Sequence, residues 1–306
     1  MRFFKDYSPF KNLIGKNSEE IITNKNTLWL IIDKVYMMAL GVFVTAIVAR
    51  YFGPEQFGIF NYALSFATLF TVFSALGLET LTVKAIVDKE ADEGTILFTS
   101  FILRLIGGLI IPMIALPIII VLEPNDRTLH IMVAILSLGM IFKSLEVIEY
   151  WIQAYQKAKI SSIIRMITFS IISVSKLSLV FLEGSIEHYT IINAFNIFIV
   201  GLSFLVTYIF YSKNRTVKKS RLRFDGTYAK SILMKSRYLI FSGFMVTIYM
   251  QIDKVMLGAL LENRAELGIY SAAVALASMW YFIPMAIITS YKPVIMRKKK
   301  SMKQNI

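Results

Sequence analysis

Long apolar runs alternate with short polar segments along nearly the whole chain. A hydrocarbon core about 30 Å thick needs roughly 20 consecutive apolar residues in a helix that crosses it. By this criterion the chain contains eight membrane-crossing segments, at residues 28–49, 57–77, 96–122, 129–151, 162–182, 189–211, 232–260 and 265–291. The pattern predicts an all-α polytopic membrane protein.

The composition agrees with a membrane protein and excludes several kinds of site. Hydrophobic residues make up 56% of the chain and charged residues 17%, with a mean hydropathy of +0.63. Soluble domains carry about 25% charged residues. The chain has no cysteine, which excludes disulfides and thiolate metal sites. Its two histidines are far apart and no Ser-His-Asp arrangement is present, so we expect no catalytic residues and no metal.

The positive charges lie mostly on one side of the predicted membrane. Basic residues fill the arm at 1–27, the linker at 212–231 and the tail at 292–306, whereas the opposite side has little beyond Arg50, Arg127 and Arg264. Cytoplasmic loops carry the excess of lysine and arginine, so both termini are expected in the cytoplasm. The net charge of +13 is explained by these flanking segments, which meet anionic lipid headgroups. Nucleic acid is therefore not an expected partner.

A short sequence occurs twice at matching places. Residues Phe57–Ala63, FGIFNYA, align without gaps with Leu267–Ala273, LGIYSAA, and Gly58 coincides with Gly268. Each copy opens the second helix of a hairpin, where a small residue lets two helices approach closely. Six spans separate the hairpins, which predicts a parallel repeat about an axis along the membrane normal. The prediction is a complete six-helix N-lobe at 28–211 and a partial, two-helix C-lobe at 232–291; chance similarity of apolar helices is the alternative.

Several ionisable residues fall inside the predicted spans, where each costs free energy unless it meets water or a partner. Arg165 and Lys176 are eleven residues apart, which places them on nearly the same face of a helix. Together with Arg104 and Lys143 they are the candidate lining of a wet cavity for an anion, above all phosphate. The alternatives are snorkelling of Arg165 and local neutralisation, such as Lys143 by Glu146.

Prolines provide a second kind of candidate. Pro112 and Pro117 lie in the third predicted span, after Gly107 and Gly108, and Pro284 lies in the eighth. A proline in a membrane helix frees a backbone carbonyl and kinks the helix unless neighbours compensate. The three prolines are therefore candidates for helix breaks or gating, with simple packing as the equal alternative.

The stretches VARYFGPEQFGIFNYA, LGLETLTVKAIV and IDKVMLGALLENRAELGIYSAA carry a recognisable resemblance. They resemble the polysaccharide transporter family, the Wzx-type flippases within the MATE-like MOP superfamily, and the likeness covers nearly the whole chain. The family's fold implies two six-helix bundles around a cationic cavity, in the bacterial cytoplasmic (inner) membrane. Within the matching motifs, charges of uncertain role lie at Asp33, Lys34, Lys84, Asp253 and Lys254.

The resemblance implies a function and its partners. The implied activity is flipping of undecaprenyl-pyrophosphate-linked oligosaccharide repeat units to the outer leaflet by alternating access. The implied partners are this lipid-linked oligosaccharide, membrane lipids, a polysaccharide polymerase and a chain-length regulator. No cofactor is implied, and whether H⁺ or Na⁺ is coupled stays open.

Departures from the family pattern leave alternatives. The family has 12 to 14 spans, so a chain with eight is expected to be a truncated member. A MATE-type small-molecule antiporter and an inactive fragment are the alternatives to the flippase. A membrane glycan polymerase or acyltransferase would need a long outer loop or a cluster of His and carboxylates, which the sequence lacks.

Overall fold

The computed structural model describes residues 18–213, 221–261 and 263–278, and almost all of them are helical. The helices are α1 (Ser18–Leu69), α2 (Thr71–Ala75), α3 (Leu78–Asp88), α4 (Glu93–Leu122), α5 (Arg127–Gly139), the three-ten helix η2 (Met140–Glu146), α6 (Val147–Ala154), α7 (Ala158–Phe181), α8 (Ile186–Lys213), α9 (Gly226–Leu260) and α10 (Arg264–Ala277). The described part contains no strand, so the predicted all-α architecture is confirmed.

Six helical stretches in the described residues are long and apolar enough to cross a membrane. The first of them contains the first predicted span and the larger part of the second, because α1 runs for 52 residues and bends at Gly53, whose φ is 73°. Only glycine adopts this left-handed conformation readily, and the following Pro54 starts a new helix well because its φ is already helical. The eighth predicted span is described only as far as α10, and Pro284 lies outside the described residues.

The segment boundaries differ from the predicted ones at polar places. Helix α1 already begins at Ser18, within the arm predicted at 1–27, while α8 reaches Lys213 and α9 starts at Gly226, both within the linker predicted at 212–231. The second predicted span is interrupted at Phe70 and again at Leu76 and Gly77, both of which have positive φ.

The prolines of the third span, Pro112 and Pro117, do not interrupt the helix, and their role in gating stays a prediction. Helix α4 continues through both, as membrane helices can when neighbouring groups satisfy the freed carbonyls. The helix interruptions lie instead in the neighbouring segments that contact Gly107 and Gly108 of α4. A Cβ on Gly107 would lie 1.7 Å from the carbonyl oxygen of Phe73 in α2, and one on Gly108 would lie 3.0 Å from Cα of Ile141 in η2.

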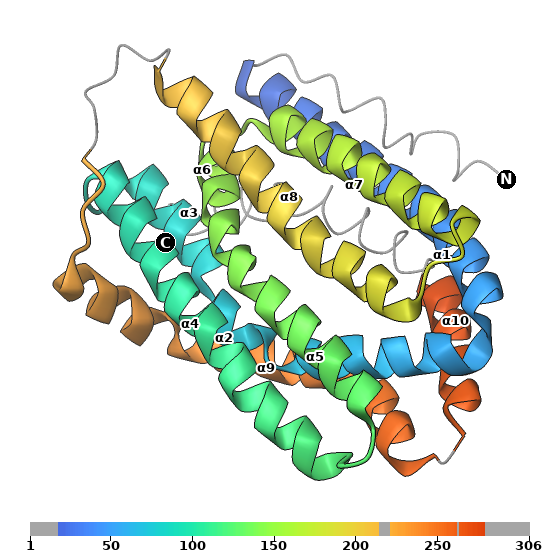
Figure 1. The fold of residues 1–306 in the computed structure, drawn as a ribbon. Coiled ribbons are helices and arrows are strands. Elements are labelled where there is room, and N and C mark those ends of the chain that lie inside the picture. The colour runs from blue at the N-terminus through green and yellow to red at the C-terminus, as the bar shows by residue number, and fades with distance from the viewer. Residues whose placement is uncertain (1–17, 214–220, 262, 279–306) are drawn as a thin grey trace, which may run out of the picture.

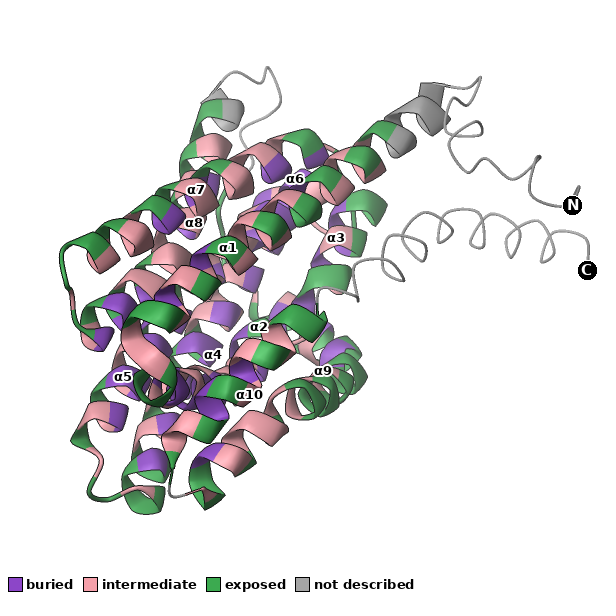
Figure 2. Ribbon diagram, turned by 90° about the vertical axis from the view of Figure 1, so that its right-hand side faces the viewer, coloured by how far each residue is buried: buried purple, intermediate pink, exposed green. Residues whose placement is uncertain are grey.

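The arrangement of the helices follows from the bend in α1. Its first half lies beside α7, and after the bend at Gly53 its second half packs against α10 and then runs on across the bundle (Figure 1). Figure 2 shows buried positions on the faces that helices turn to one another and exposed positions on the outer faces. Many exposed positions are large and apolar, among them Phe43, Met113, Val121 and Val174. Such a surface suits lipid, since soluble monomers rarely expose large apolar patches.

The two copies of the repeated sequence touch at their shared glycine. A Cβ on Gly58 would lie 1.9 Å from the carbonyl oxygen of Arg264 and 3.0 Å from the nitrogen of Gly268. A Cβ on Gly268 would lie 1.9 Å from the carbonyl oxygen of Pro54 and 3.1 Å from the nitrogen of Gly58. Pro54 and Arg264 each precede their glycine by four residues, so the contact is reciprocal. Two helices related by a local two-fold axis between the glycines make this pattern.

Candidate functional site

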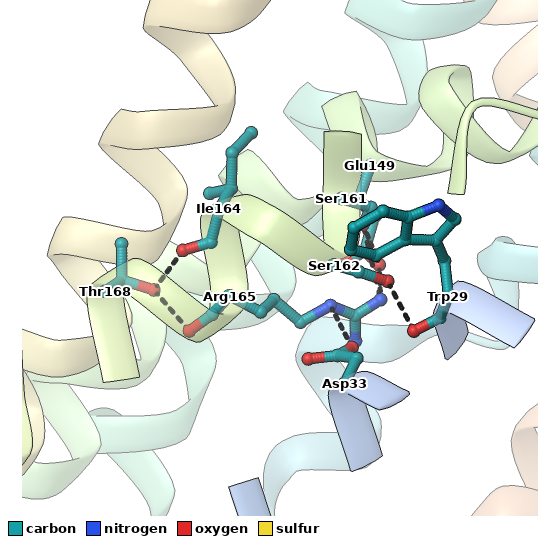
Figure 3. Close-up of polar contacts among 8 residues, drawn as sticks. All are labelled: Trp29, Asp33, Glu149, Ser161, Ser162, Ile164, Arg165 and Thr168. Atoms are coloured by element: carbon teal, nitrogen blue, oxygen red, sulfur yellow. Dashed lines mark hydrogen bonds and ion pairs between the residues drawn. The ribbon is translucent and has the colours of Figure 1, made fainter. Parts of the chain in front are cut away.

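Arg165 of α7 lies between two carboxylates that other helices supply. Its guanidinium pairs with Glu149 of α6, and its Nε lies 3.6 Å from Oδ2 of Asp33 in α1 (Figure 3). Ser161 Oγ donates to Oε1 of Glu149 over 2.9 Å. Asp33 is only 2% exposed, and its Oδ1 finds no hydrogen-bond partner in the described part of the chain. Three helices therefore meet at one half-buried arginine.

Hydrogen bonds between α1 and α7 hold this cluster in place. Ser162 Oγ donates to the carbonyl of Trp29 over 3.2 Å, and the hydroxyls of Tyr36 and Ser170 lie 2.6 Å apart. Both pairs flank Asp33 along α1. Small polar residues of this kind allow membrane helices to pack closely and bond across the contact.

Arg104 of α4 forms a second cluster. Its partners belong to the fourth predicted span, which also carries Glu149. Its Nη2 lies 2.8 Å from Oε2 of Glu146, and its Nη1 donates to the hydroxyl of Tyr150. Arg104 is 1% exposed. Neutralisation of Glu146 by Lys143, one alternative from the sequence, is not what the structure shows. The reason is energetic: an unpaired arginine this deeply buried costs far more than a half-buried lysine.

Lys176 of α7 is held without an acid. Its Nζ donates to Oδ1 of Asn193 over 2.8 Å and lies 5.0 Å from the centroid of the Tyr189 ring, both in α8. Lys143 in η2 is half-buried, and neither lysine has an ion pair with the described residues. Of the four predicted cavity cations, Arg104 and Arg165 are therefore neutralised by acids, and only the two lysines keep an unbalanced charge among the described residues.

The face of α7 on which Arg165 and Lys176 were predicted to lie together does not form a continuous polar surface. The Thr168 hydroxyl bonds to the carbonyls of Ile164 and Arg165 in its own helix, and Glu183 follows the end of α7 in an exposed turn. Arg165 reaches toward α1 and α6, whereas Lys176 reaches toward α8. The two cations thus belong to separate environments.

The motif charges fall into three environments. Asp33 is buried beside Arg165, whereas its neighbour Lys34 is exposed, as adjacent residues on one helix must point apart. Lys84 is exposed on α3. Asp253 accepts a hydrogen bond of 2.5 Å from the hydroxyl of Tyr270, and its other oxygen accepts from the backbone N–H of the half-buried Lys254.

Sequence reasoning missed a polar cluster at the opposite end of the bundle. Arg264, at the start of α10, lies 2.7 Å from Oε1 of Glu123, which caps the end of α4. The Arg264 guanidinium also lies 4.7 Å from the centroid of the Tyr62 ring, and the Tyr62 hydroxyl donates to the same Glu123 oxygen over 3.4 Å. The only signal for this cluster in the sequence was that Glu123 and Arg264 lie in polar segments that flank spans on the same side.

Comparisons with known proteins give the family and the fold. The family model described as "Polysaccharide biosynthesis protein" matches residues 23–298. A solved structure, the inward-facing conformation of a multidrug resistance MATE family transporter of the MOP superfamily, is similar with a TM-score of 0.56 and 14% identity. The similarity covers 91% of this chain and 61% of that one, so this chain spans less than two thirds of the transporter's length. No curated protein matches.

These matches confirm the family and fold that the motifs suggested. The apolar helices and the fold together establish a multi-pass membrane protein with a MATE-like helical architecture. The family match extends over both the six-helix part and the repeated glycine segment. The chain belongs to the polysaccharide biosynthesis protein family.

Proposed function

We propose that the protein flips undecaprenyl-pyrophosphate-linked oligosaccharide repeat units from the cytoplasmic to the outer leaflet by alternating access. Family membership and the transporter-like fold support a membrane transporter. The location is the bacterial inner membrane with both termini in the cytoplasm, since the basic segments lie on that side. Its partners are the lipid-linked oligosaccharide, membrane lipids, a polysaccharide polymerase and a chain-length regulator.

The proposal of an anionic cargo depends on the environment of Lys176. A diphosphate cannot enter hydrocarbon without a replacement for its water, and a lysine ammonium supplies a charge and three donors. Lys176 spends one donor on Asn193 and has no described carboxylate to neutralise it. Lys143 is the second cation of this kind. Arg104 and Arg165 act as positioning residues, because they join α4 to η2 and α7 to α1 and α6.

The membrane potential favours this direction of transport. A cytoplasm-negative potential of 100 mV drives negative charge outward, and each charge moved in that direction gains roughly 2.3 kcal/mol. A pyrophosphate headgroup carries its negative charge across in this favourable direction. The same potential is available whether or not H⁺ or Na⁺ is also coupled.

Reconstitution into proteoliposomes tests the proposal. The probe is a fluorescent undecaprenyl-pyrophosphate oligosaccharide, and the readout is the fraction that reaches the opposite leaflet. We expect the wild-type chain to flip the probe and Lys176→Ala to slow it on the order of tenfold, the factor that loss of one charged hydrogen bond gives. Lys34→Ala is the matched control, since Lys34 is an exposed lysine in a span. Equal rates for Lys176→Ala and Lys34→Ala would remove the support for an anionic cargo.

A MATE-type antiporter for small cations is the second candidate, and one observation favours it. Around Arg165 and Arg104 three carboxylates, Asp33, Glu146 and Glu149, face two guanidiniums. An excess of acid suits a cationic solute rather than a diphosphate. Efflux of a cationic dye from the same proteoliposomes, together with no movement of the lipid probe, would establish this alternative.

A further inference from the structure

The end of the bundle that holds Gly53, Glu123 and Asn263 is here termed the outer end, after its predicted orientation. At this end Tyr62 of α1, Glu123 at the end of α4 and Arg264 of α10 form one polar cluster, here termed the latch. Tyr62 and Glu123 belong to the six-helix part, and Arg264 belongs to the two helices that follow the linker. The ion pair therefore joins the two halves of the chain.

The latch is well built for a polar contact near a helix end. The side chains of Arg264 and Glu123 are 14% and 20% exposed, so water screens their attraction only in part. The Glu123 carbonyl accepts from Nε2 of His130 over 2.7 Å, which fixes the backbone that carries the carboxylate. Tyr62 is wedged against α9, since a Cβ on Gly258 would lie 2.4 Å from the Tyr62 ring.

The crossing of α1 and α10 at Gly58 and Gly268 lies next to the latch, and it differs from the latch in charge and in symmetry. It contains no charge, and its reciprocal geometry makes the same contact from both halves. The latch has no counterpart across the two-fold axis, because the residue equivalent to Arg264 is Pro54, which has neither charge nor donor. Relative rotation of the halves about the crossing would keep the glycines in contact but would separate Arg264 from Glu123.

The geometry points to Glu123–Arg264 as a latch that holds the outer ends of the two halves together and must open before cargo can leave on that side. The solved transporter that this fold resembles is described as inward-facing, a state in which the outer side is closed. This inference rests on the proposed function, because a latch matters only to a protein that opens alternately to its two sides. These residues control the conformation of the protein, and none of them needs to contact the cargo.

Distance measurements in the full chain test the latch. The chain has no cysteine, so Asn125→Cys and Glu266→Cys, both exposed at the outer end, accept spin labels at defined places. With these reporters, Arg264→Gln should raise the ratio of separated to closed outer ends on the order of tenfold, the loss expected for one charge-assisted hydrogen bond. Arg127→Gln, an exposed arginine at the same end, is the control and should leave the ratio unchanged.

Two further variants make the result decisive. The exchanged pair Glu123→Arg with Arg264→Glu should return the distances toward the wild-type distribution, because the ion pair re-forms with its ends swapped. If Arg264→Gln does not fold, Glu123→Gln keeps the shape of the side chain and takes its place. Distances for the latch variants that equal those of Arg127→Gln, or an exchanged pair that fails to restore the wild-type distribution, overturn the latch.

The same samples separate this inference from the proposed function. A chain that flips no lipid probe but shows the distance shift loses its assigned cargo and keeps the latch. A chain that flips the probe while Arg264→Gln leaves the distances unchanged keeps the cargo and loses the latch. The two readouts are independent because the distance measurement requires no substrate.

Discussion

The reciprocal glycine contact makes a sharp stability prediction. Replacing Gly268 with alanine would place a Cβ 1.9 Å from the carbonyl oxygen of Pro54. Real Cβ atoms are essentially never closer than 3.0 Å to such an atom, so α1 and α10 must separate by roughly 1 Å. The obstacle is backbone, which cannot rotate away as a flexible side chain can. Gly58→Ala meets the matching obstacle at Arg264 and should behave in the same way.

The magnitude follows from two opposing contributions. Overpacking of a close contact costs about 1–3 kcal/mol, whereas alanine in place of glycine inside a helix gains about 0.5–1 kcal/mol. The net loss of about 1–2 kcal/mol corresponds to a melting temperature lower by roughly 2–3 °C in a chain of this size. Because both substitutions disturb one contact, the double variant should lose less than the sum of the single losses.

Thermal unfolding of the purified protein in detergent measures these effects. Gly243→Ala in α9 is the matched control, since the nearest atom to its Cβ would be Val72 Cγ2 at 4.0 Å. This control should melt at or slightly above the wild-type temperature. A Gly268→Ala protein that melts together with Gly243→Ala would show that the two helices do not cross at these glycines.

Three other outcomes are expected. Arg104→Met alone leaves Glu146 without its partner and should destabilise the protein by about 3 kcal/mol in thermal melting, whereas Arg104→Met with Glu146→Leu should recover most of the loss; equal melting of both variants would contradict a buried ion pair. Pro112→Ala should preserve lipid flipping, because α4 is continuous through this proline; loss of flipping in a normally folded protein would instead support a gating role for Pro112. A single cysteine introduced within 214–220 should react only with a membrane-permeant reagent, and labelling from outside would reverse the orientation.

Features set by local sequence were predictable. The third predicted span, 96–122, lies within α4 at Glu93–Leu122, and the fifth, 162–182, nearly coincides with α7 at Ala158–Phe181. Length and apolar content decide whether a segment can cross a membrane, so such helices are visible in the sequence. The contact between Gly58 and Gly268 was also foreshadowed, because the repeated sequence places the same small residue at equivalent points.

Partners of charged side chains were not predictable. Glu146 has a lysine three residues away, yet it pairs with Arg104, which is 42 residues distant. Arg264 and Glu123 are separated by 141 residues. Inside a bundle a charge binds whichever opposite charge the tertiary structure brings to it, since leaving it unpaired costs several kcal/mol. Spacing along one helix can propose a pair, but it cannot exclude a better partner on another helix.

The η2 segment has a geometric consequence for the fourth span. Its seven residues wind at about three per turn instead of 3.6, which adds about 140° of rotation over the segment. A helical wheel drawn uniformly through 129–151 therefore assigns Glu149 and Tyr150 to the wrong side. If η2 changed into a regular α-helix, α6 would rotate about its own axis by more than a third of a turn. Glu149 would then point away from Arg165. The three-ten winding of η2 therefore determines which basic residue pairs with Glu149.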